Sequence, residues 1–202
     1  MNLAQRPAWI FDMDGTLTVA IHDFEQIRRD LGVPSGQPIL EYLDRLPADR
    51  AAPLRRRLGR VEETLAARAE PMPGAASLLT RLRREGCRLG VLTRNRKDCA
   101  LTTLATCGLL RFFEQDEVVG REEAPAKPEP DGLLMLLDTW KLPSSAAVMI
   151  GNYLFDLQAG HAAGARTVYV DPSGDFPYRD HADDQVRDLR ELQALVWPEK
   201  AE

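Results

Sequence analysis

Five short apolar segments constrain the fold of this chain more than any other feature. They cover residues 8–11, 88–92, 117–119, 147–150 and 167–170. Most of them are bounded by polar residues, glycine or proline, and apolar and polar side chains do not alternate within them. Strands of a parallel sheet that is covered on both faces have this pattern, because both faces of each strand are buried. We therefore expect a buried parallel sheet.

Apolar residues at helical spacing lie between these segments. Two stripes recur at i, i+3, i+4 and i+7, and a third is narrower: Ala75, Leu78, Leu79 and Leu82; Leu133, Leu136, Leu137 and Trp140; Val186, Leu189, Leu192 and Leu195. Strands that alternate with helices predict an α/β fold with a doubly wound, Rossmann-like parallel sheet. In such folds ligands bind beyond the carboxyl ends of the strands.

One part of the chain, residues 19–70, breaks this alternation with helical patterns and no good strand. Its stripes are Ile21, Phe24, Ile27 and Leu31, then Leu54, Leu58, Val61 and Leu65, with a short helix expected over 39–46. A stiff connector, Pro71-Met72-Pro73-Gly74, closes it. We expect a core domain formed by residues 1–18 and 71–202, and a small helical domain of residues 19–70 inserted after the first strand.

Composition excludes several classes of protein. The chain has 202 residues, of which 44% are hydrophobic and 28% charged, and a net charge of −5. These values are ordinary for a soluble globular protein, and the acidic balance disfavours a nucleic-acid binder. No apolar run approaches the ~18 residues that cross a bilayer, and no signal-peptide pattern is present. We therefore expect no membrane partner. Three cysteines without CxxC spacing indicate reduced thiols, so we expect a cytoplasmic protein.

Polar side chains follow four of the expected strands. Asp12 and Asp14 come directly after the first strand, and Gly15 allows the backbone to turn sharply there. An Asp-Gly surface turn gives the same pattern. Thr93, Arg94 and Asn95 follow the second strand. A hydroxyl and backbone N–H groups at that place are suited to hold a phosphate. The alternative is that Thr93 or Asn95 caps the next helix.

Two further strand ends complete this set. Lys127 follows the third strand, in a chain with only four lysines. Asn152 and Asp156 follow the fourth, where Asp156 either caps a helix or reaches a metal ion. Oxygen ligands of this kind suit Mg²⁺ rather than zinc. A carboxylate is a sensible nucleophile for phosphoryl transfer.

In their order along nearly the whole chain, these residues resemble the four motifs of the haloacid dehalogenase superfamily. The sequence Asp12-Met13-Asp14-Gly15-Thr16 is the most specific element, and the others are Thr93, the Lys127-Pro128 pair, and Asn152 with Asp156. The insertion after the first motif resembles the small helical C1 cap of the phosphoglycolate-phosphatase-like branch. The resemblance implies a Mg²⁺-dependent phosphatase that acts on a small phosphorylated metabolite.

The resemblance also implies roles for individual residues. Asp12 attacks phosphorus and Asp14 is the general acid and base. Thr93 and Lys127 hold the phosphoryl oxygens, and Lys127 keeps Asp12 ionised. The full expected substrate-binding set is Gly15, Thr16, Thr93, Arg94, Asn95 and Lys127, and the expected metal ligands are Asp12, Asp14, Asn152 and Asp156.

Asn152 departs from the family pattern, in which an aspartate at this place is usually a direct metal ligand. The loss of one carboxylate predicts weaker Mg²⁺ binding. Residues 19–70 contain no lysine, which disfavours a phosphonatase that forms a Schiff base there. A phosphomutase of the same family, and a non-catalytic member that binds a ligand or partner, stay open as alternatives. A dehalogenase is less favoured, because dehalogenation does not need Asp14.

Overall fold

A six-stranded parallel sheet forms the centre of the molecule. The computed structural model describes residues 2–198. The strand order is β3-β2-β1-β4-β5-β6, and every neighbouring pair is parallel. The strands are β1 (Ala8–Phe11), β2 (Arg88–Leu92), β3 (Val118–Val119), β4 (Ala147–Gly151), β5 (Arg166–Val170) and β6 (Asp184–Val186). The predicted α/β, doubly wound fold is confirmed.

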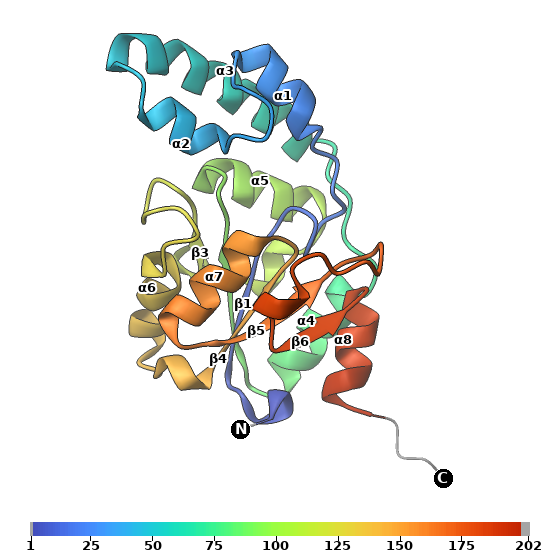
Figure 1. Ribbon diagram of the computed structural model, residues 1–202. Helices are drawn as coiled ribbons and strands as arrows, with labels where there is room; N and C mark the ends of the chain where they lie inside the picture. Colours follow the sequence, from blue (N-terminus) through green and yellow to red (C-terminus); the bar gives the residue numbers. More distant parts are fainter. Residues whose placement is uncertain (1, 199–202) are drawn as a thin grey trace.

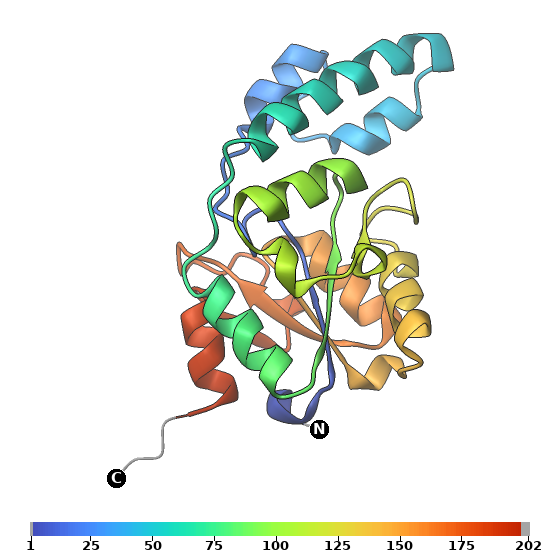
Figure 2. The same ribbon diagram turned by 180° about the vertical axis from the view of Figure 1, so that it is seen from behind.

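Helices cover both faces of this sheet (Figures 1 and 2). On one face, Trp9 and Phe11 of β1 pack in a core with residues of α4 (Ala75–Arg84), α5 (Lys97–Thr106) and α8 (Leu189–Val196). On the other face, Ala8 and Ile10 pack with residues of α6 (Asp131–Trp140), while α7 (Leu154–Ala163) packs on β4 and β5. Successive β1 side chains therefore enter opposite cores, which explains why this strand is apolar throughout.

The structure differs from the predicted elements mainly near the carboxyl end of the chain. Strand β6 was not expected, because it has only three residues and only Val186 is buried. Val186 therefore belongs to a strand rather than to the predicted helical stripe. Helix α8 begins at Leu189, where the Asp188 carboxylate accepts hydrogen bonds from the N–H groups of Arg190 and Glu191. Within the described residues, five short 3₁₀ helices complete the main elements: Leu3–Gln5, Leu110–Phe112, Gln115–Glu117, Ser144–Ala146 and Arg179–His181.

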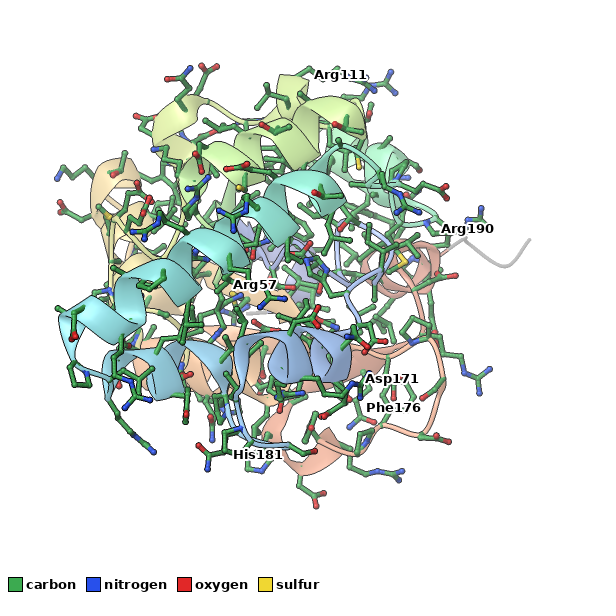
Figure 3. The ribbon with its side chains drawn as sticks, turned by 90° about the horizontal axis from the view of Figure 1, so that it is seen from above. Arg57, Arg111, Asp171, Phe176, His181 and Arg190 are labelled. Carbon is green, nitrogen blue, oxygen red and sulfur yellow. The ribbon has the colours of Figure 1, made fainter. Side chains whose placement is uncertain are left out.

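The helical insertion, residues 19–70, lies above the carboxyl ends of the strands (Figure 1). It contains α1 (Phe24–Leu31), α2 (Ile39–Asp44) and α3 (Ala48–Ala66). Seen from above, α1 and α3 lie side by side, with Arg57 of α3 exposed (Figure 3). The insertion has a small core of its own, formed by Ile27, Leu31, Val33, Leu43 and Leu58.

Two antiparallel linkers join the insertion to the rest of the molecule. The Val19 N–H donates to the Glu70 carbonyl over 2.9 Å, and the Met72 N–H donates to the Leu17 carbonyl over 2.8 Å. This arrangement fits the predicted division into core and inserted domains, which stays a prediction. Among residues 2–198, none of the helices has the length and apolar composition needed to cross a bilayer.

Candidate active site

The turn after β1 holds two carboxylates at the carboxyl edge of the sheet. The Asp12 N–H donates to the Ile150 carbonyl of β4 over 2.8 Å, which fixes the first residue beyond the strand. Gly15 has a φ of +88°, a backbone conformation that side chains disfavour. A Cβ atom at this position would also collide with the Asn152 side chain. Glycine is therefore required for this turn to pass close to the end of β4.

Lys127 is the most deeply buried charged group of the site, with 1% of its surface exposed. Its Nζ lies 2.7 Å from Asp12 Oδ1 and 2.7 Å from Asp156 Oδ1, and donates to the Leu92 carbonyl over 2.6 Å. Burial opposes its charge, but the two carboxylates more than offset this effect and raise the pKa of Lys127. An ammonium group has three N–H donors, and all three have acceptors here.

Asp14 lies beside Asp12 and faces the residues that follow β2. Its Oδ2 accepts a hydrogen bond from Asn95 Nδ2 over 2.8 Å, and its Oδ1 is 3.7 Å from His22 Nδ1. Burial raises the pKa of Asp14 to about 7, and the Lys127 charge only partly opposes this rise. A carboxyl group in this state exchanges protons near neutral pH. Burial likewise raises the pKa of Asp12, against the opposing charge of Lys127.

Thr93, Arg94 and Asn95 form the loop after β2. The buried Thr93 Oγ1 accepts a hydrogen bond from the Asn95 N–H over 3.1 Å. Neither Thr93 nor Asn95 caps the next helix, because the N-cap of α5 is Arg96. The guanidinium of Arg94 already has partners within the protein. Its Nη2 donates to both oxygens of Glu41 over 2.7 and 2.8 Å, and its Nη1 donates to the Lys127 carbonyl.

Asn152 faces the oxygen atoms of the first motif. Its side-chain amide lies 3.3 Å from Asp12 Oδ2 and 3.2 Å from the Asp14 carbonyl oxygen. If the amide nitrogen faces these two oxygens, it donates a hydrogen bond to each. If the amide oxygen faces them, the oxygens of Asn152, Asp12 and the Asp14 carbonyl converge with no hydrogen atom between them. The hydroxyl of Thr16 is 3.5 Å from Asn152 Oδ1. This oxygen set fits a hard divalent cation.

Asp156 has other partners. Its Oδ1 contacts Lys127, and its Oδ2 accepts a hydrogen bond from the Tyr153 N–H over 2.9 Å at the start of α7. Both carboxylate oxygens of Asp156 are therefore engaged within the protein. Its role as a metal ligand stays a prediction. Within residues 2–198, no three His, Cys, Asp or Glu side chains are grouped to hold a metal ion. Asn152 is not one of these four residue types, so it does not count toward such a group.

Comparisons with known proteins identify the family. The model of haloacid dehalogenase-like hydrolases matches residues 7–164. A haloacid dehalogenase-like hydrolase domain-containing protein of Arabidopsis thaliana is 30% identical, over 93% of this chain and 82% of its own. The chain belongs to the haloacid dehalogenase-like hydrolases. A phosphoglycolate phosphatase of Cupriavidus necator is 33% identical over 62% of this chain and 55% of its own. The crystal structure of a hydrolase from Pseudomonas syringae has a TM-score of 0.77 at 23% sequence identity, and the match covers 93% of this chain and 96% of that chain.

These matches confirm the predicted family and the prediction that the protein is an enzyme of this family. The phosphatase class expected from the sequence agrees with the name of the Cupriavidus relative. The motif residues Asp12, Asp14, Thr93, Lys127 and Asn152 all line one cavity of about 250 Å³ in this hydrolase.

The helical insertion contributes to the same cavity. His22, Phe24, Leu58 and Glu62 line it from above. His22 stacks on Phe24, with 5.3 Å between the ring centroids. These residues were not expected as site residues, because they follow no motif. The only sequence signal was the place where the insertion leaves the sheet.

Among residues 2–198, three arginine–glutamate ion pairs join the insertion to the core of this hydrolase. Arg121 donates to both oxygens of Glu62 over 2.7 and 3.0 Å, and both side chains are largely buried. The two other pairs are Arg94–Glu41 and Arg96–Glu63. In each pair the arginine comes from the core and the glutamate from the insertion. The sequence shows these charges but does not indicate how they pair.

Proposed function

We propose that this hydrolase is a Mg²⁺-dependent phosphatase of small phosphomonoesters that transfers the phosphoryl group to Asp12. One observation carries the proposal. The carboxylate of Asp12 stands at the end of the central strand with Oδ1 fixed by the buried Lys127, while Oδ2 lies 3.3 Å from the Asn152 amide. A carboxylate that is held in one orientation is suited to attack phosphorus in line with the leaving oxygen.

The proposed reaction has two steps. First, an Asp12 oxygen forms a bond to phosphorus while the bond to the ester oxygen breaks, and Asp14 gives its proton to the leaving alcohol. Second, Asp14 takes a proton from a water molecule as that water attacks phosphorus, which releases inorganic phosphate and restores the Asp12 carboxylate. Asn95 supports both steps, because its hydrogen bond to Asp14 Oδ2 holds that carboxyl beside the reaction.

The Thr93 hydroxyl is proposed to bind a phosphoryl oxygen. The Lys127 ammonium, whose three N–H groups already have acceptors, is proposed to stabilise the phosphoryl oxygens through its charge. The positive charge of Lys127 also opposes the repulsion between the Asp12 carboxylate and the anionic substrate. Asp156 is proposed as a positioning residue, because it contacts the same Lys127 nitrogen from the other side.

Mg²⁺ is the proposed cofactor, held by Asp12 Oδ2, the Asp14 carbonyl and the Asn152 amide oxygen. When bound, it would supply positive charge that stabilises the phosphoryl oxygens in the transition state. We also propose a cytoplasmic location, which the three free cysteines support.

The test is release of inorganic phosphate from para-nitrophenyl phosphate with and without Mg²⁺, in the wild type and in Asp12→Asn. We expect Mg²⁺-dependent turnover that the substitution abolishes while the circular dichroism spectrum is preserved. Phosphate release separates the phosphatase from a phosphomutase, and turnover separates it from a non-catalytic binding protein. Wild-type turnover in the variant would mean that Asp12 is not the nucleophile.

A further inference from the structure

Part of the cavity wall is apolar. Phe24 and Leu58 line it from the insertion, and Tyr153 and Phe155 line it from the loop and helix after β4. Phe24 is 52% exposed and Tyr153 47% exposed, although both are large apolar side chains. Water next to such surfaces is released when an apolar group covers them. This wall therefore favours a ligand whose organic part has an apolar face.

The cations of this cavity already have carboxylate partners. In the part of the chain that the structure describes, each Arg or Lys that lines the cavity is paired. Arg94 binds Glu41 with two hydrogen bonds and lies over the ring of Phe155, 4.7 Å from its centroid. Arg28 donates to Glu25 over 2.7 Å and to the Gln37 carbonyl over 2.9 Å. Lys127 is committed to Asp12 and Asp156.

The other acidic groups that line the cavity have partners of their own. Asp14 faces the imidazole of His22, and both oxygens of Glu62 accept hydrogen bonds from Arg121. A substrate with a second anionic group would place that group near these carboxylates, with no unpaired arginine or lysine among the lining residues to receive it. Desolvation of a charge without a partner opposes binding strongly.

We propose that the substrates are phosphomonoesters whose alcohol portion is small, uncharged and partly apolar, and that esters carrying a carboxylate or a second phosphate are disfavoured. This inference rests on the proposed function. The cavity volume of about 250 Å³ is below the usual range for a ligand site, which favours a small alcohol portion.

The test compares three esters whose alcohol portions have the same heavy-atom skeleton. They are 3-methylbutyl phosphate, 2-carbamoylethyl phosphate and 2-carboxyethyl phosphate, and they differ in polarity and charge but not in size. The measured quantity is kcat/KM for phosphate release with Mg²⁺. We expect the order apolar, amide, carboxylate, with at least about a tenfold difference between the first and the last.

The outcomes separate this inference from the proposed function. A kcat/KM for the carboxylate ester equal to or above that of its amide isostere overturns the inference while leaving the phosphatase intact. Turnover of para-nitrophenyl phosphate with none of the three esters hydrolysed overturns it as well. No phosphate release from any ester, para-nitrophenyl phosphate included, refutes the proposed function itself.

Two variants test the residues that carry the argument. Phe24→Ala should lower kcat/KM for 3-methylbutyl phosphate about tenfold and leave the carboxylate ester almost unchanged. Leu134→Ala is the matched control, because Leu134 is 42% exposed on α6 and does not line the cavity. An equal loss on both esters in Phe24→Ala would show that Phe24 does not act through apolar contact.

The second variant, Glu41→Gln, releases Arg94 from its carboxylate partner. The ratio of kcat/KM for the carboxylate ester to that for 3-methylbutyl phosphate should then rise about tenfold. Asp44→Asn is its control, since Asp44 pairs with the exposed Arg55 outside this cavity. An unchanged ratio in Glu41→Gln would contradict the view that paired arginines exclude anionic alcohols.

Discussion

Replacement of Lys127 by methionine is the perturbation whose effect follows most directly from the structure. Methionine keeps an unbranched side chain and removes the ammonium that lies 2.7 Å from both Asp12 Oδ1 and Asp156 Oδ1. Two buried carboxylates then face each other without a cation between them. The Leu92 carbonyl also loses its hydrogen bond from the lysine.

The size of the effect can be worked from these contacts. Removal of one partner of a buried ion pair commonly costs about 3–5 kcal/mol, because the other charge stays buried without compensation. We expect the free energy of unfolding of Lys127→Met to fall by about this amount. Loss of a preorganised donor to the transition state typically lowers kcat by about 10²–10³. Lys127→Arg should recover little activity, because a guanidinium spreads its N–H donors over three nitrogens, whereas three acceptors here surround one nitrogen.

Chemical unfolding and steady-state phosphatase assays measure these two effects. Asp156→Asn added to Lys127→Met removes one of the two facing carboxylates and should restore about 1–3 kcal/mol of stability. The same addition should not restore activity. Full activity in Lys127→Arg, or an additive loss of stability in the double variant, would refute the role given to the Lys127 network.

Asn152 and Glu62 give two further predictions. Asn152→Asp should lower the Mg²⁺ concentration for half-maximal activity roughly tenfold, or by about 1.4 kcal/mol, because it adds a charge beside Asp12 Oδ2; an unchanged titration would show that residue 152 does not bind the metal. Glu62→Gln should destabilise the protein by about 3–5 kcal/mol and increase its radius of gyration in solution scattering, because Arg121 loses its buried partner. Additive unfolding energies in a cycle with Arg121→Met would contradict direct coupling.

The sheet and the strand-end residues could be predicted because local sequence determines them. Strand β1 packs into a core on each face, so its four residues are all apolar and stand out in the sequence. Asp12 and Asp14 follow it directly, and parallel strands bring the ends of β2 and β4 beside them. Strand β6 gave no such signal, since it lies at the sheet edge and Val186 is its one buried residue.

The contacts between the insertion and the core could not be predicted, because they depend on how the three inserted helices lie over the sheet. Arg94 was expected to bind substrate, and its residue type is suited to that role, but in the structure it binds Glu41 of α2. Likewise, Glu62 is buried against Arg121, and no local pattern in the sequence indicates this contact. The sequence separation of each pair exceeds any local pattern.

The central claim is that Asp12 carries the phosphoryl group during turnover. Acid quenching of the enzyme during turnover of para-nitrophenyl phosphate, followed by peptide mass spectrometry, tests it directly. We expect a phosphoryl adduct on the peptide that contains Asp12, present with Mg²⁺ and absent from Asp12→Asn. Steady turnover with the adduct on another residue, such as His22, would contradict it.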